Sequence, residues 1–345
     1  MWQEHRRDGD LDKGRGAVVT REHRRQEVGK VDVENANERW NCDPEELSLA
    51  ARESLRRARV AEAGGDIEGR ISALRTAIEA APHAPSLRAM LAVALRQAGR
   101  TGEAVEVSQE ALRLDPGQLV SSINLGVLLY QDGRSEEGIE QLRQTVAQWP
   151  ASSLARQSYA EILSVSGDAA GALAQIRQAL RHDPFDPEVH CALGDVLRVA
   201  GETDKAMRAY RQALDLDPEH YMANLELGGL LMFQGRPRDA LDYLEAATKA
   251  EPGKPLAHFA FGSTLYDCGY FAEAVYELRE SVRLAPDKAE SHLTLAEALM
   301  SEGEYAEAWN EIHICQDLGY EVSDRTLALL SLAMPEPPRS KSLRK

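Results

Sequence analysis

Three histidines recur at multiples of one spacing, and they are the residues with the clearest potential for chemistry. His258 and His292 lie 34 residues apart, and His190 lies two such intervals before His258. Imidazole nitrogens gathered in a column can bind a metal ion or exchange protons. A repeated chain, however, produces a column at every packing position, whatever residue is there. We therefore expect these histidines to be half-buried packing residues, and we predict no metal site.

Other arrangements that would indicate catalysis are missing from the sequence. There is no glycine-rich phosphate-binding loop, no HExxH zinc motif and no GxSxG nucleophile motif. His313 and Cys315 lack two further ligands at zinc spacing. Glu302 and Glu304 are expected on a solvated helix face. The sequence predicts no cofactor and no enzymatic activity.

Charge and cysteine content narrow the class of protein. A formal net charge of −16 is unfavourable for general nucleic-acid binding, which needs a basic surface. No apolar run reaches the roughly 18 residues of a transmembrane helix, and the first residues lack the apolar core of a secretory signal. The four cysteines are far apart and show no CxxC spacing, so disulfides are not expected. These features predict a cytoplasmic protein without direct membrane insertion.

The elements that would position these residues repeat every 34 residues. Counting from Pro187 as position 1 gives eight windows without a gap, from Ala51 to Val322. Position 8 is always Ala or Gly, position 15 is always Gly, and position 32 is Pro in every window but the last. Glycine closes a helix C-terminus, proline prevents a helix from continuing, and small residues let two backbones approach. Each window therefore predicts a pair of helices.

This pattern resembles the tetratricopeptide repeat, a helix–turn–helix unit of 34 residues. The resemblance covers residues 51–322 and implies an all-α, right-handed superhelical solenoid of antiparallel helix pairs. Two features depart from the family pattern. Position 4, often tryptophan in the family, is Ser, Arg, Asn or His here, and the first window carries Arg57 where the others carry Leu, Tyr or Phe. Neither departure changes the predicted fold.

The chain is predicted to have four parts. Residues 1–43 are charged, without apolar periodicity, and are expected to be disordered, although Trp2 and Val18–Val19 leave a short docking motif as the alternative. Residues 44–322 form the eight-repeat domain, whose first helix opens near Asp43 and Pro44. Residues 323–334 form a capping helix over the last repeat. Residues 335–345 form a flexible basic tail.

The resemblance also implies where a partner binds. In the family, positions 2, 5, 6, 9, 12 and 13 of the first helix line a concave groove that commonly holds a peptide. In windows 6 to 8 these positions carry many apolar residues, which would form an interaction site if exposed. Acidic residues among them, including Asp267, Glu290 and Glu297, could pair with a basic partner. The predicted groove residues are Met222, Leu225, Glu226, Met232, Phe233, Leu256, Phe259, Tyr266, Leu293 and Met300.

Arginines on the same face of windows 1 and 2 form a second candidate site. They are a possible anchor for carboxylates or phosphates, and packing between repeats is the alternative. These residues are Arg52, Arg56, Arg59 and Arg96. The Lys and Asn pattern of the family's chaperone-binding clamp is missing, with Asn124 the only asparagine at a clamp-like position 6.

The sequence thus predicts a non-enzymatic scaffold or adaptor that binds a segment of a partner protein in its groove. Two alternatives remain open. The protein could self-associate into a structural assembly, or it could be an accessory subunit of an enzyme or of a membrane-associated complex.

Overall fold

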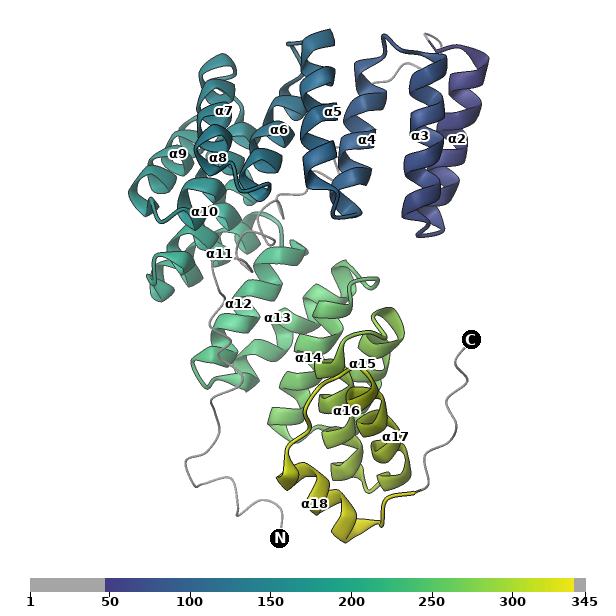
Figure 1. The fold of residues 1–345 in the computed structure, drawn as a ribbon. Helices are drawn as coiled ribbons and strands as arrows, with labels where there is room; N and C mark the ends of the chain where they lie inside the picture. The colour runs from purple at the N-terminus through teal and green to yellow at the C-terminus, as the bar shows by residue number, and fades with distance from the viewer. Residues whose placement is uncertain (1–46, 338–345) are drawn as a thin grey trace. The chain divides into compact units, whose positions relative to one another are not determined.

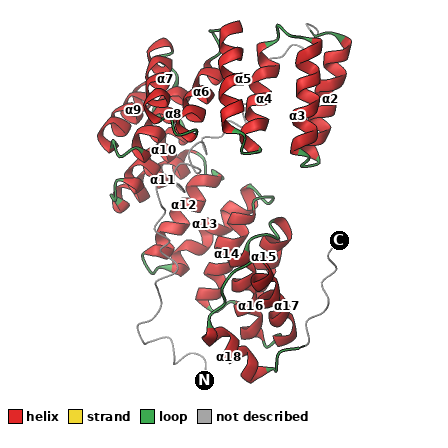
Figure 2. Cartoon of the chain, viewed as in Figure 1, coloured by secondary structure: helices red, strands yellow, loops and turns green. Residues whose placement is uncertain are grey.

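Every regular element that the structure describes is a helix. The computed structural model describes residues 47–337, which hold 17 helices and no strand (Figures 1 and 2). Residues 1–46 and 338–345 lie outside this range, and so do the predictions for the N-terminal segment, for a helix start at Asp43 and for most of the basic tail. The all-α prediction is confirmed.

The chain divides into two compact units at the Asp183–Pro184 boundary, and each is described by itself. Unit 1 contains four helix pairs, and consecutive helices from α2 to α9 contact each other. Its helices are α2 (Leu49–Ala63), α3 (Ile67–Ala80), α4 (Pro85–Gln97), α5 (Thr101–Leu114), α6 (Leu119–Gln131), α7 (Ser135–Gln148), α8 (Ser153–Val165) and α9 (Ala169–His182).

Unit 2 contains four further pairs and one final helix. The first helices of its later pairs, α12, α14 and α16, also contact one another in sequence. Its helices are α10 (Pro187–Val199), α11 (Thr203–Leu216), α12 (Tyr221–Phe233), α13 (Pro237–Ala250), α14 (Pro255–Cys268), α15 (Phe271–Leu284), α16 (Ala289–Glu302), α17 (Tyr305–Asp317) and α18 (Asp324–Ala333).

The first pair of unit 2 shows why the sequence forms helices of this length. Asp186 caps α10, its side chain accepting from the backbone N–H of Glu188, and Pro187 is the first helical residue. Gly201, between α10 and α11, has φ of 77°, which a residue with a side chain rarely adopts. The position-15 glycine has positive φ in all eight windows, so the predicted turn is confirmed.

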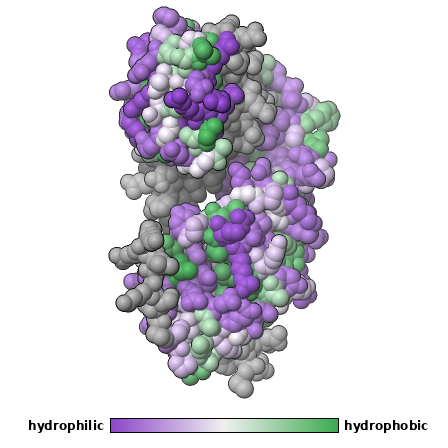
Figure 3. All heavy atoms as spheres, turned by 90° about the vertical axis from the view of Figure 1, so that its right-hand side faces the viewer, coloured by the Kyte–Doolittle hydropathy of each residue, from purple (hydrophilic) through white to green (hydrophobic). Residues whose placement is uncertain are grey.

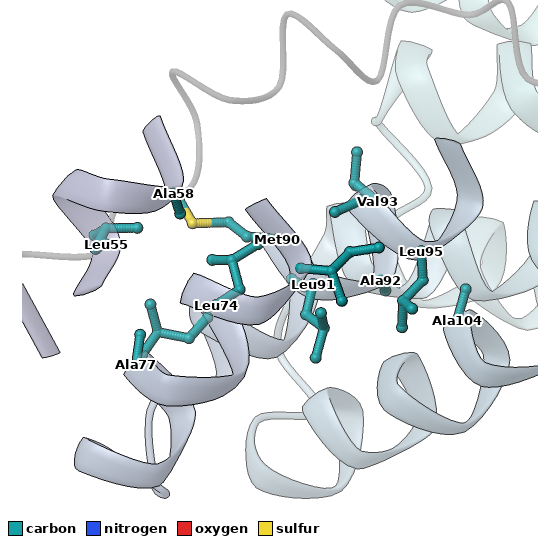
Figure 4. Close-up of a cluster of buried hydrophobic side chains, with 14 of the residues drawn as sticks. Leu55, Ala58, Leu74, Ala77, Met90, Leu91, Ala92, Val93, Leu95 and Ala104 are labelled. Carbon is teal, nitrogen blue, oxygen red and sulfur yellow. The ribbon is translucent and has the colours of Figure 1, made fainter. Parts of the chain in front are cut away.

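The core of unit 1 is built from large side chains that surround small ones. Leu74, Leu87 and Leu95 are each 1% exposed or less. In Figure 4 the side chain of Met90 from α4 extends toward Ala58 of α2, beside Leu74 of α3. The small residue leaves room for the neighbouring helix, because interiors are close-packed.

The core of unit 2 ends beneath α18. Leu330 of α18 is fully buried with Trp309 and Ile312 of α17, and the indole N–H of Trp309 donates to the carbonyl of Met334 at 3.0 Å. Ser323 caps α18 by accepting from the N–H of Thr326. The helix thus covers apolar residues of the last pair. None of the described helices is long and apolar enough to cross a membrane.

Candidate partner-binding surface

The first helices of unit 2 carry the predicted groove residues, and the structure separates them by burial. Phe233, at the end of α12, is 85% exposed, and Leu256, near the start of α14, is 53% exposed. Leu225 and Met300 are only 7% and 6% exposed. These two therefore pack in the interior, and their inclusion among surface residues does not fit the structure. Their positions indicated the right helix face but not how much of the side chain is covered.

Five further apolar residues of the predicted set are half-buried. Phe259, Tyr266 and Leu293 pack against the apolar core of unit 2 while keeping part of their surface exposed. We call the exposed and half-buried apolar set the apolar strip. It lies on α12, α14 and α16, which contact one another in that order. The strip consists of Met222, Met232, Phe233, Leu256, Phe259, Tyr266 and Leu293.

Charged residues accompany the apolar strip. Glu226 of α12 forms an ion pair with Arg198 of α10 at 3.2 Å, and Arg198 also forms an ion pair with Asp195 at 3.8 Å. Asp195 in turn accepts the hydroxyl hydrogen bond of Tyr210 at 2.7 Å. Sequence reasoning selected Glu226 but missed Arg198 and Asp195. Their positions 12 and 9 in window 5 were the available signal, because both belong to the groove set.

The predicted arginine anchor is only partly assembled. Arg52, Arg56 and Arg59 are exposed on successive turns of α2. Arg56 forms an ion pair with Glu53 at 3.1 Å, and this hydrogen bond lowers the pKa of Glu53. Arg96 lies on α4 and is half-buried. The structure therefore groups three of the four arginines on one helix, where Arg52 also donates to the carbonyl of Leu47 at 2.9 Å.

A set of buried polar residues that sequence reasoning largely missed lies on α6 and α8 of unit 1. Asn124, Ser158 and Ser164 are each 6% exposed or less. Their Nδ2, Oγ and Oγ atoms have no hydrogen-bond partner among the described residues. Buried polar atoms almost always have one, so such a set needs an explanation. Asn124 and Arg96 also line a narrow crevice between α4 and α6. We call Asn124, Ser158 and Ser164 the polar strip.

Two cysteines and one acidic residue of the described chain lie in environments that suppress reactivity. Burial raises the pKa of Cys191, and it raises that of Cys315 to about 12, so both thiols stay protonated. A depression of about 370 Å³ between α5, α6 and α7 is lined by Glu and Gln with two leucines. Hydrogen bonds from Arg143 and Gln144 lower the pKa of Glu140 there to about 2, so it remains an ionised carboxylate.

The histidine column serves packing in the structure. His190, His258 and His292 each place Nε2 about 3 Å from the carbonyl oxygen of the proline six residues earlier. Within residues 47–337, no group of three or more His, Cys, Asp or Glu side chains is arranged to hold a metal ion.

The face drawn in Figure 3 is largely hydrophilic, with hydrophobic residues in separate patches.

Comparison with known proteins links these features to a family. One model described as tetratricopeptide repeat matches residues 76–219, and a second with the same description matches residues 191–255 and 225–288. Together they span residues 76–288, more than half of the chain. No curated protein matches at a significant level.

Two solved structures resemble the chain along much of its length. A tetratricopeptide repeat protein from Parabacteroides merdae is 14% identical with a TM-score of 0.52, over 73% of this chain and 100% of that one. The APC/C hetero-tetramer Cut9–Hcn1 is 14% identical with a TM-score of 0.54, over 92% of this chain and 64% of that one. At these identities the likeness shows the fold alone.

Proposed function

Because this chain belongs to the tetratricopeptide repeat family, we propose that it is a non-enzymatic scaffold that binds a segment of a partner protein. The proposal rests on one observation above all: Phe233 and Leu256 expose large apolar side chains on neighbouring first helices of unit 2. Covering a side chain of this size stabilises a complex by about 1.5–3 kcal/mol. A few such anchors supply most of the affinity at typical interfaces.

The chemistry around the anchors favours an apolar segment with basic residues. Glu290 is exposed at position 2 of α16, and the side chain of Glu226 is 24% exposed. Methionines 222 and 232 add flexible side chains that adapt to a ligand. An amphipathic helix or extended segment that places apolar residues on the strip, with Lys or Arg facing these carboxylates, would match it.

A second candidate contact area for the same kind of partner lies on α2 of unit 1, where Arg52, Arg56 and Arg59 are exposed. The exposed arginines of α2 would suit acidic residues of that segment. This contact is independent of the apolar strip, since its residues belong to the other unit.

A scaffold role agrees with the environment of the candidate catalytic groups. The described cysteines are unpaired, which suits a reducing cytoplasmic location, and the buried thiols are not reactive. Under this proposal any chemistry would belong to the partner. If the protein is an accessory subunit, that partner is an enzyme or a membrane-associated complex.

The experiment compares capture of partners by three full-length baits. Phe233→Ser with Leu256→Ser removes both exposed anchors of the strip. Leu332→Ser is the matched control, because Leu332 of α18 is also 85% exposed. Quantitative mass spectrometry should show one set of proteins lost with the double variant and retained with the control. Equal recovery by all three baits would reject the strip as the binding surface.

Self-assembly is the alternative that needs its own measurement. Sedimentation of the purified wild-type chain over a wide concentration range distinguishes it from partner binding. A mass that rises with concentration, and that the double variant abolishes, would make the apolar strip an assembly surface. A constant monomer mass supports the scaffold proposal.

A further inference from the structure

Position 4 of three first helices in unit 2 forms a hydrogen bond to the preceding loop. The Nε2 atoms of His190, His258 and His292 lie 2.9, 3.0 and 3.1 Å from the carbonyl oxygens of Pro184, Pro252 and Pro286. A carbonyl oxygen can only accept a hydrogen bond. Each Nε2 therefore carries the hydrogen in these contacts.

The second ring nitrogen distinguishes two of the histidines from the third. Nδ1 of His258 lies 2.7 Å from a carboxylate oxygen of Glu277, and Nδ1 of His292 lies 2.5 Å from one of Glu311. In window 5 the residue equivalent to these glutamates is Ala209. Nδ1 of His190 is buried and has no partner among the described residues.

The two complete pairs need one proton more than a neutral imidazole and a carboxylate provide. A neutral imidazole has one N–H, and the Nε2 contact already uses it. The Nδ1 contact to a carboxylate then requires a second hydrogen, carried either by the ring or by the carboxyl group. His190 requires no such proton, because its Nδ1 faces no carboxylate.

We propose that His292–Glu311 is a proton-dependent clamp, which holds the last helix pair together when protonated and weakens as the proton is lost. It joins α16 to α17 through Nδ1, and α16 to the preceding loop through Nε2. Without the proton, one ring nitrogen would turn a lone pair toward an acceptor, either the Glu311 carboxylate, whose side chain is only 19% exposed, or the Pro286 carbonyl. That contact is then lost, because two hydrogen-bond acceptors that face each other repel.

The direction in which pH changes the stability follows from the pKa of His292. The hydrogen bond that Glu311 accepts from the ring raises the pKa of His292, although burial acts in the opposite sense. A raised pKa in the folded state means that the clamp stabilises the fold fully below the ordinary value of 6.5. That stabilisation is lost as pH rises through the folded-state pKa.

Among the groups around His258 and His292, Glu277 and Glu311 are the carboxylates in direct contact with the imidazole rings. Near His258, α15 also carries Glu280, which is ion-paired with Arg283 at 2.7 Å. Near the His292 clamp, α17 carries Cys315, a neutral thiol, and α16 carries Glu290. Within the described residues, α12, α13 and α14 provide neither a hydrogen bond nor an ion pair to His292. The other hydrogen bond of His258 is to the carbonyl of Pro252, in the loop between α13 and α14.

Other windows contain versions of the same contact that do not titrate. Arg156 donates to the Pro150 carbonyl and to the side-chain oxygen of Gln175, both at about 3 Å. Asn224 donates to the Pro218 carbonyl at 2.9 Å. Glutamine at the position of Glu311 and asparagine at the position of His292 therefore both occur in this array. They define variants that should fold.

The test uses the full-length chain and compares Glu311→Gln with the wild type. A glutamine amide can accept from a charged imidazole or donate to a neutral one, so the contact survives without the extra proton. Glu302→Gln is the matched control on an exposed site of α16. Histidine titrations by NMR, with His292→Asn for assignment, and unfolding by urea are followed from about pH 5 to about pH 9.

The expected result has two parts. His292 titrates above 6.5 in the wild type and in Glu302→Gln, and it moves toward 6.5 in Glu311→Gln. The wild type and Glu302→Gln lose stability as pH rises through that titration, relative to both Glu311→Gln and His292→Asn. Equal His292 pKa values in wild type and Glu311→Gln, or parallel stability curves for all four proteins, would overturn the proposal. Neither readout depends on a bound partner.

Discussion

Gly228 of α12 lies directly against Leu244 of α13. A methyl group placed on Gly228 would be 2.6 Å from Cγ of Leu244, a side chain that is fully buried. Gly262 and Leu278 show the same relationship in the next pair, at 2.8 Å. The small residue at position 8 therefore sets how closely the two helices of a pair approach.

The first prediction compares two adjacent glycines of α12. Gly228→Ala should destabilise the protein by about 1–3 kcal/mol, because the added methyl group overpacks the contact with Leu244. Gly229→Ala should be neutral or stabilising by up to about 1 kcal/mol, because its methyl group would meet nothing within 4 Å. Urea unfolding measures both. Similar changes for the two variants would mean that helix propensity, not packing, controls this site.

The sequence predicted the repeat well because its signals are local. The glycine at position 15 and the proline at position 32 act on their own backbone, so the helix bounds follow from them. Exposure within the groove set was harder to predict. Leu225 and Phe233 both occupy groove positions of α12, yet one is buried and the other is largely exposed. Exposure depends on side chains from neighbouring helices, which the register of one window does not specify.

The atypical Arg70 of the first window leads to a second prediction. Other windows carry Ala or Gly at this position, whereas Arg70 is buried, pairs with Glu62 at 2.8 Å and donates to Gln97 at 2.8 Å. Arg70→Ala should cost about 1.5–3 kcal/mol, the typical contribution of hydrogen bonds to charged groups. Arg70→Met retains the aliphatic volume and separates packing from charge. A thermal midpoint unchanged in both variants would contradict a structural role for Arg70.

The third prediction tests how α18 closes unit 2. Leu330→Ala should cost about 2–5 kcal/mol of local stability, because Leu330 is fully buried against α17. Leu332→Ala is the control on the same helix, since that side chain is 85% exposed. Hydrogen exchange should show loss of protection in α18 and α17 for the first variant only. Unchanged protection with Leu330→Ala would show that α18 does not stabilise the last pair.

The fourth prediction concerns the polar strip. Ser158→Ala and Ser164→Ala should leave the free chain equally or more stable, because each removes a buried hydroxyl that lacks a partner. Urea unfolding measures the stability of both variants. A loss of more than about 1 kcal/mol in the free chain would indicate that the hydroxyls form hydrogen bonds within the fold.

The central claim, that the apolar strip binds a partner protein, is tested most directly by crosslinking from within it. A photoreactive amino acid replaces Phe233 in one version of the chain and Leu332 in another, two positions of equal exposure. If the strip binds a partner, one protein is crosslinked from position 233 and not from position 332, and this crosslink is lost when Leu256→Ser is added. The same crosslinked proteins from both positions, or none from position 233, would contradict the claim.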